Sequence, residues 1–352
     1  GRTTAGFSRQ LAIPRRQDHE LSPGRQRLPS ASGVRRRQKH PDRPFGAKAF
    51  SGAGCVSLFD DSGYQPLSDR HIDYADLSRL ERDLFIAVKG KDLFEEKLRS
   101  FFRSAIDEVI DTARTGRYFL SDLEKTEKTY LGTKFEILLR DWLQVPKGVK
   151  LDLLIGGQEV DVKSTTGGKS GWMIPLEAIG ELCILLRVNE DASTCAVGLV
   201  RARQEYLRSG KNQDKKTSFS AEGTRNIWWM VQDFAYTPNF WNIVSDSDRL
   251  EIMAVRGGSK RLAMFLERYQ GIPLSRVQIQ AIAAQDDFMK RIRSNQGARD
   301  LLRQKGIAVL YSENDRDLMQ RLGITFGYRE FVSYQPKNDL EKRLLRNAGY
   351  ID

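Results

Sequence analysis

Two aspartates and a lysine close together in the chain have the types and spacing for metal-assisted chemistry. Residues 151–163 form two short runs around Gly156-Gly157, a pattern typical of a β-hairpin with a two-residue loop. In that register Asp152 lies opposite Asp161 at roughly 5 Å, and Lys163 projects from the same face. Like charges in opposite positions destabilise a hairpin, and a divalent cation between them would remove that cost.

This arrangement of hard oxygen ligands beside an ammonium group suits Mg²⁺-dependent hydrolysis of phosphodiesters. A metal ion held by the two carboxylates would bind a water and a phosphate oxygen, and Lys163 would orient that water or stabilise charge on phosphorus. Asp, a gap of eight residues and Asp-x-Lys is the pattern of the PD-(D/E)xK nucleases. The same pattern also arises by chance, and the alternative is a solvated hairpin with alternating charges.

A third acid, Glu136, lies within a predicted helix over residues 124–143. The apolar stripe of that helix consists of Leu131, Phe135, Leu138 and Trp142, and Glu136 lies beside it. A helix that leads into a hairpin can direct a carboxylate at the metal. The alternative is an ordinary charge on the helix surface.

Composition excludes several other kinds of chemistry. The three histidines all lie within the first 71 residues, so imidazole-based hydrolysis and histidine-ligated zinc are not expected in the folded body. The three cysteines form no CxxC pair, which argues against a disulfide framework and a cysteine zinc site and favours a reducing cytoplasm. No apolar run approaches about 18 residues, so no membrane span is predicted.

The chain length predicts two folded domains plus an extension. Residues 1–66 are expected to be a disordered arm, because they are rich in Pro, Ser and Gly and lack apolar periodicity. Residues 1–48 alone carry a net charge of +9, whereas the rest of the chain carries +2. The first methionine is Met173, so the arm is interpreted as non-native sequence, a DNA-contacting tail or a transit peptide.

Residues 67–232 are expected to form a mixed α/β domain. Buried strands are predicted at 172–175, 183–188 and 195–200, after helices whose apolar residues recur at helical spacing between 77 and 110. The polar stretch 207–225 is expected to be a surface loop or the start of a linker. Trp228 and Trp229 are expected in the core or at a domain contact, with base stacking as the alternative.

Residues 233–352 show the element order of a winged helix-turn-helix. We expect a helix over 259–270, a turn at 271–273, a helix over 275–284, a basic helix starting at Asp286-Asp287 and a strand at 307–311. The basic helix would present DNA-binding residues, with a solvated charged helix as the alternative. These residues are Lys290, Arg291, Arg293 and Arg299.

Several segments in order along residues 105–312 resemble the NaeI family of type II (type IIE) restriction endonucleases. In the first domain the similar segments are Arg114-Thr115-Gly116-Arg117, Lys125-Thr126-Glu127-Lys128-Thr129, Gly132-Thr133, Glu136-Ile137, Val160-Asp161 with Lys163, Gly171-Trp172-Met173 and Ile179-Gly180. In the second they are Ala284-Gln285-Asp286-Asp287-Phe288-Met289-Lys290-Arg291, Gly297-Ala298-Arg299 and Lys305-Gly306-Ile307. The arm 1–65 and the tail after about 335 show no such similarity.

The resemblance implies a homodimer with a restriction-endonuclease domain followed by a winged-helix-like domain. It implies that each domain binds double-stranded DNA, giving two DNA copies per dimer, and that the second copy activates cleavage. It places the metal-binding acids on Glu136, Asp152 and Asp161 and the lysine on Lys163.

The prediction is therefore a Mg²⁺-dependent, sequence-specific double-strand DNA endonuclease of a restriction-modification system. Two alternatives stay open from the sequence. One is a repair or mismatch nicking nuclease on the same fold, and the other is a non-catalytic winged-helix regulator that binds DNA.

Overall fold

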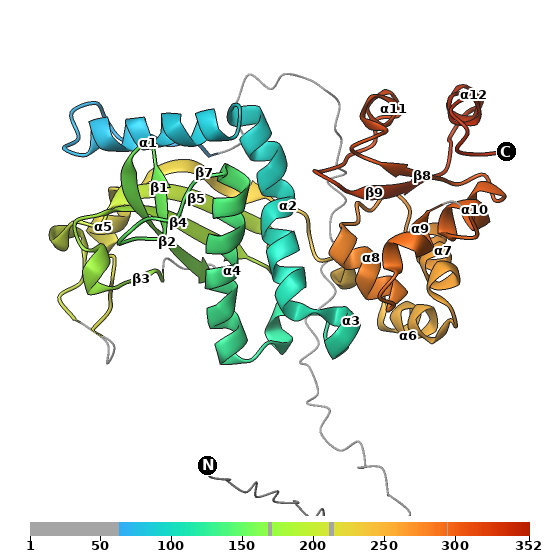
Figure 1. The fold of residues 1–352 in the computed structure, drawn as a ribbon, viewed down its shortest axis with the longest axis horizontal. Coiled ribbons are helices and arrows are strands. Elements are labelled where there is room, and N and C mark those ends of the chain that lie inside the picture. The colour runs from blue at the N-terminus through green and yellow to red at the C-terminus, as the bar shows by residue number, and fades with distance from the viewer. Residues whose placement is uncertain (1–62, 168–170, 211–214, 294) are drawn as a thin grey trace, which may run out of the picture. The chain divides into compact units, whose positions relative to one another are not determined.

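A five-stranded mixed β-sheet is the centre of the first half of the protein (Figure 1). The computed structural model describes residues 63–167, 171–210, 215–293 and 295–352. The strand order is β1 (Leu153–Ile155), β2 (Gln158–Thr166), β4 (Leu182–Asn189), β5 (Thr194–Arg201) and β7 (Trp228–Ala235). Strands β2 and β4 are parallel, and the other neighbours are antiparallel. The predicted mixed α/β class and the three predicted strand regions are confirmed.

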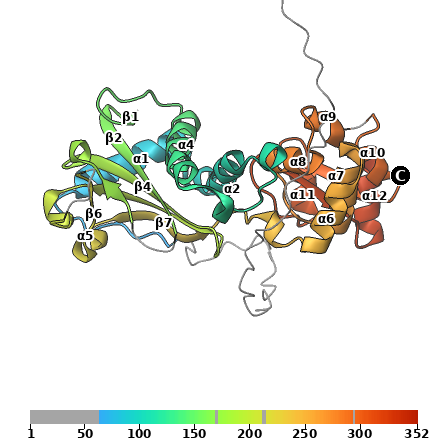
Figure 2. The same ribbon diagram turned by 90° about the horizontal axis from the view of Figure 1, so that it is seen from below.

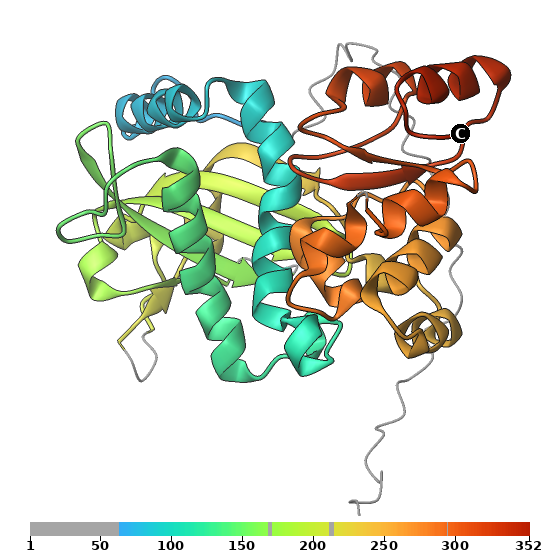
Figure 3. The same cartoon turned by 45° about the vertical axis from the view of Figure 1, so that its right-hand side comes forward.

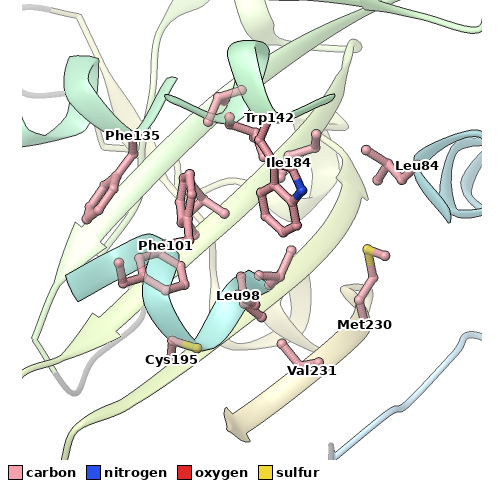
Figure 4. Packing of buried hydrophobic residues seen from close by; sticks show 14 of the residues in the cluster. Leu84, Leu98, Phe101, Phe135, Trp142, Ile184, Cys195, Met230 and Val231 are labelled. Atoms are coloured by element: carbon pink, nitrogen blue, oxygen red, sulfur yellow. The ribbon is translucent and has the colours of Figure 1, made fainter. Parts of the chain in front are cut away.

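Three long helices pack on one face of this sheet, as Figures 2 and 3 show from two further directions. They are α1 (Tyr74–Ala87), α2 (Lys91–Ile110) and α4 (Lys125–Leu143). Apolar residues three and four positions apart form the buried stripe of each helix, as the sequence periodicity predicts. Figure 4 shows Leu98, Phe101, Phe135 and Trp142 among the side chains of this core. Truncating the fully buried Phe135 to alanine would cost about 3–5 kcal/mol of stability.

A second, smaller core covers the opposite face of the sheet. Trp172, Leu207, Phe219 and Trp229 pack in it, together with Ile174 of the short strand β3 (Met173–Ile174) and residues of neighbouring segments. Strand β3 pairs with the equally short β6 (Thr217–Ser218). The interpretation of 207–225 as a loop or linker is therefore wrong for its described residues. Leu207 pairs with Phe219 in an isolated bridge, and α5 (Ala221–Arg225) follows, because the few apolar residues in this polar stretch fill the core.

The two adjacent tryptophans lie on opposite faces of β7. Trp228 belongs to the helix-covered core and Trp229 to the smaller core, and both are buried. The expectation that they pack in the interior is confirmed. Strands β4 and β5 are also buried on both faces, because one core covers each face of the sheet. This double burial explains their nearly continuous apolar runs.

Two observations bear on the expected domain boundaries, which remain predictions. Gln65 and Trp229 exchange both backbone hydrogen bonds at 2.9 Å, so the folded part begins before residue 66. The rest of the expected arm, residues 1–62, lies outside the described residues. The expected boundary at 232 falls inside β7, and the change from one core to the next comes between Tyr236 and Phe240.

Helices dominate the second half of the protein. These are α6 (Asp246–Ala254), α7 (Gly258–Arg268), α8 (Arg276–Ala283), α9 (Phe288–Ile292), α10 (Ala298–Arg303), α11 (Arg316–Arg321) and α12 (Asp339–Asn347), with an antiparallel pair β8 (Ala308–Tyr311) and β9 (Phe331–Tyr334). Ser275 begins α8 with a capping box: its hydroxyl accepts from the Gln278 amide, and the Gln278 side chain accepts from the Ser275 amide. The described part of the chain also contains α3 (Thr112–Thr115) and the 3₁₀ turns Leu120–Asp122, Leu176–Ala178, Gln204–Tyr206 and Phe240–Asn242.

The expected basic helix after Asp287 is present as α9, but it is short, and a turn separates it from α10, which carries Arg299. Asn295 and Gln296 have φ values of +72° and +70°, in the left-handed region that a helix does not use. A Cβ atom at Gly297 would lie 1.9 Å from the Arg293 carbonyl oxygen, so glycine is required where the chain doubles back. The tail after 335 is folded too, since Leu345 of α12 and Ile351 are buried beside β8 and β9.

Candidate functional site

The predicted hairpin forms with the predicted register. Leu153 pairs with Val160 and Ile155 with Gln158, and Gly156 and Gly157 turn the chain with φ values of +55° and +80°. Both values suit the type I′ turn of a two-residue hairpin loop. Asp152 lies one residue before β1, where the ladder has ended.

Beyond the end of β1, the Asp152 side chain replaces a backbone carbonyl as the hydrogen-bond acceptor for β2. Its Oδ2 accepts a hydrogen bond of 2.8 Å from the backbone amide of Val162 in β2. This bond fixes the Asp152 carboxylate beside the middle of β2.

Asp161 and Lys163 meet Asp152 on one face of β2. Lys163 Nζ lies 2.6 Å from Asp161 Oδ2 and 3.9 Å from Asp152 Oδ2, and it donates to the Val162 carbonyl at 3.2 Å. The single positive charge of Lys163 therefore faces two carboxylates and offsets only one of their two negative charges. The structure brings these three predicted residues together.

The environment of Asp161 is unusually apolar for a carboxylate. In the parallel register Asp161 pairs with the buried Cys183, and its side chain is only 6% exposed. Burial raises the pKa of Asp161 to about 6, while the Lys163 ammonium acts in the opposite direction. The Lys163 ammonium, 2.6 Å away, is the partner of Asp161 Oδ2, and the angle of this contact is poor for a hydrogen bond. A buried carboxylate oxygen such as Asp161 Oδ2 is suited to bind a cation.

Helix α4 places Glu136 near this group without bringing it into contact. Gly132 allows α4 to approach β2 closely, because a Cβ there would already lie 3.0 Å from Ser164 Oγ. Glu136 follows one helical turn later, and partial burial followed by the charge of Asp152 raises its pKa. The Arg140 guanidinium lies 3.5 Å from its Oε1 and opposes that shift.

No three carboxylate, imidazole or thiolate side chains of residues 63–167, 171–210, 215–293 and 295–352 are grouped closely enough to hold a metal ion. The structure therefore presents two acids and a lysine, with Glu136 outside them. The hard oxygen donors of Asp152 and Asp161 fit a divalent cation such as Mg²⁺. Glu136 would have to move toward them to join its ligands.

Glu159 is a positioning residue that the sequence analysis missed. Its carboxylate accepts hydrogen bonds from the backbone amides of Val149 and Leu151 at 2.7 and 2.8 Å, and from that of Lys150 at 3.3 Å. These backbone bonds lower the pKa of Glu159. They hold the loop that leads into Asp152. The sequence could have indicated this role, because the hairpin register places Glu159 across from that loop.

The four predicted DNA-binding residues of the second half do not share one helical face. Lys290 and Arg291 belong to α9, Arg293 follows it and Arg299 belongs to α10. Arg291 is paired with Asp287 through contacts of 2.6 and 3.1 Å. Arg299 donates to the Val309 carbonyl at 2.9 Å. Lys290 and Arg293 are exposed.

The mixed α/β fold, with Asp161 and Lys163 on a strand of a central mixed sheet and the Asp152 carboxylate beside that strand, is consistent with the restriction-endonuclease class. The family model described as restriction endonuclease NaeI matches residues 85–337. The type II restriction enzyme NaeI of Lentzea aerocolonigenes is 30% identical over 257 residues, covering 71% of this chain and 79% of that protein. The chain therefore belongs to the restriction endonuclease NaeI family, a family of site-specific deoxyribonucleases, and the resemblance identified from its motifs is confirmed.

All of the candidate site residues lie inside the matched range. Type II restriction endonucleases generally use divalent metal ions, in agreement with the oxygen donors found here. No helix in the described part of the chain has the length and apolar character needed to cross a membrane.

Proposed function

We propose that this protein is a Mg²⁺-dependent endonuclease that cuts both strands of DNA at a specific sequence. The observation that carries the proposal is the group formed by Asp152, Asp161 and Lys163, with Nζ 2.6 and 3.9 Å from the two carboxylates. Family membership supports the reaction class. We assign this half of the chain to the PD-(D/E)xK type.

Each residue of the group has a distinct part in this proposal. Asp161 and Asp152 would hold the cation, with Glu136 as a third ligand that moves in. The bound cation would polarise a phosphate oxygen and lower the pKa of a water. The Val162 amide keeps the Asp152 carboxylate oriented. Once the cation binds the two acids, Lys163 would no longer be paired with them and would orient the attacking water or stabilise charge on phosphorus.

We further propose that the second half is a winged-helix-like domain that binds a second copy of double-stranded DNA. The order α7, turn, α8, α9 and α10 followed by the β8–β9 pair supports this assignment. Lys290 and Arg293 are the exposed cations for phosphate contact, and Arg291 and Arg299 complete the basic set. The active form would be a homodimer in which the second duplex activates cleavage.

We also place the protein in the reducing cytoplasm. Cys183 and Cys195 are free and buried, and burial raises the pKa of both thiols, so these cysteines are suited to packing and not to disulfide formation.

A plasmid digestion with matched variants tests the proposed site. Asp161→Ala and Lys163→Ala should each reduce double-strand cleavage by about a hundredfold or more, because each removes a group acting on the reacting phosphate. EDTA should stop the wild type, and Ca²⁺ should support specific binding without cleavage. Asp191→Ala and Lys342→Ala are the charge-matched controls at exposed positions. Cleavage at the wild-type rate by both site variants would refute the assignment, and nicking without double cuts would favour a repair nuclease.

A further inference from the structure

A cavity of about 380 Å³ opens in the second half of the protein, between α8, α9, α10 and the β8–β9 pair. Three guanidinium groups, two aromatic rings and a side-chain amide contribute to its wall. These belong to Arg276, Arg293, Arg299, Tyr311, Phe331 and Asn314. A volume of this size lies at the lower end of small-molecule sites, which span about 300–1,000 Å³.

One part of the cavity wall is strongly basic. The side chain of Arg293 forms no hydrogen bond or ion pair with any other described residue, and Arg276 packs over the ring of Phe288 at 5.8 Å. Arg299 is held in place by the Val309 carbonyl at 2.9 Å. Guanidinium groups that converge without a carboxylate partner are suited to a phosphate, which they bind through paired hydrogen bonds.

The acid in the wall does not cancel this charge. Glu313 lies 2.6 Å from Arg329 Nε and accepts from the Tyr311 hydroxyl at 2.7 Å. Its negative charge is already compensated outside the arginine group, so the cavity keeps an excess of positive charge.

The rest of the cavity wall is aromatic and apolar. Tyr311 and Phe331 stack with ring centroids 4.4 Å apart, and Met289 and Ile292 lie in the same wall. The Asn314 side chain is exposed at the rim and can donate and accept hydrogen bonds. A flat heteroaromatic base suits such a wall, since every base has a π-face that packs favourably against an aromatic side chain.

We propose that this cavity binds one nucleotide, with its phosphate on Arg276, Arg293 and Arg299 and its base against Tyr311. A phosphate of an intact duplex would need only the arginines, whereas a cavity with an aromatic wall and an amide at its rim suits a base as well. The nucleotide could be a free mononucleotide or a nucleotide turned out of a duplex. The second source rests on the proposed DNA binding by this half of the chain, and the first does not.

Calorimetric titration of the full chain with deoxynucleoside 5′-monophosphates tests the proposal. The wild type should bind them saturably and more tightly than it binds inorganic phosphate or the unphosphorylated deoxynucleosides. Arg276→Ala and Arg293→Ala should each weaken binding about tenfold or more, and Arg343→Ala, an exposed arginine on α12, should leave it unchanged. Asn314→Ala, at an exposed position, should reduce the preference among the four bases and retain phosphate binding.

Equal affinity for phosphate and nucleotides, or unchanged nucleotide binding in both arginine variants, would overturn the proposal. A competition experiment then separates the two sources. Displacement of a fluorescent mononucleotide by a duplex carrying the cleavage site, in EDTA, supports a nucleotide turned out of DNA, and simultaneous binding supports a free mononucleotide. Failure of the proposed endonuclease would show instead in the cleavage assay with Asp161→Ala, which is a separate measurement.

Discussion

Replacing Glu330 by glutamine should stabilise the protein above neutral pH. Glu330 is 1% exposed at the start of the β9 region, and it accepts hydrogen bonds from the Gly327 amide at 2.6 Å and from the Thr237 hydroxyl at 3.3 Å. Burial raises its pKa from 4.5 to about 7, because these two bonds offset only part of the lost hydration. Glutamine keeps the shape and can satisfy both neighbours, since its carbonyl accepts from Gly327 and its amide faces a hydroxyl that can accept.

The magnitude follows from the two pKa values. Between pH 4.5 and about 7 the folded protein keeps a proton that the unfolded chain has released. Stability must therefore fall as pH rises through this range, by about 1.4 kcal/mol per pH unit. The wild type should lose about 3 kcal/mol from this carboxyl by pH 8. The Glu330→Gln variant should match it near pH 4.5 and exceed it by about that amount at pH 8.

Chemical denaturation at a series of pH values between 4.5 and 8 measures this difference. Glu177→Gln, at an exposed position, provides the matched control and should follow the wild type at every pH. A Glu330→Gln variant with the same stability difference from the wild type at pH 5 and pH 8 would refute the reasoning. It would mean that the carboxyl does not change its protonation on unfolding.

Three further outcomes are expected. Glu136→Gln should slow single-turnover cleavage less than Asp161→Ala does, because Glu136 lies outside the group of acids in this structure. Deleting residues 1–62 should preserve plasmid cleavage and weaken nonspecific DNA binding at low salt. Deleting residues 1–65 should in addition lower the melting temperature, because the two backbone hydrogen bonds between Gln65 and Trp229 are lost. A plasmid with one recognition site should be cut slowly, and adding a short cognate duplex should raise the cleavage rate. The Arg293→Ala variant should lose this increase and keep the slow basal rate.

The hairpin and its charged group could be predicted because local rules specify them. The Gly156-Gly157 pair requires a turn with positive φ at both positions, and the turn fixes which residues lie opposite each other. The period of two along a strand then places Asp161 and Lys163 on one face without any knowledge of the rest of the fold. The side-chain bond from Asp152 to the Val162 amide could not be foreseen, because it depends on β1 ending at Leu153.

The basic region of the second half could not be predicted in the same way. A basic helix starting at Asp286-Asp287 is favoured by the sequence, and its end is signalled only weakly, by Asn295 and Gly297, two residue types that tolerate the left-handed backbone of a turn. Tertiary packing imposes that turn. Similarly, the polar residues around 207–225 conceal Leu207 and Phe219, which become core residues only because one face of the sheet would otherwise be exposed.

The unequal lengths of β1 and β2 explain why the candidate site lies where it does. Strand β2 pairs with β4 from Val160 to Thr166, but β1 pairs with it only from Gln158 to Val160. Beyond Val160 the outer edge of β2 is therefore not covered by β1, and Asp152 uses its carboxylate to satisfy one amide there. Asp161 and Lys163 lie in this stretch, with a buried sheet on one side and an edge that β1 leaves open on the other. A rigid strand thus holds the reacting groups at a border of the sheet, which is the position from which they could reach a phosphodiester too large to enter the interior.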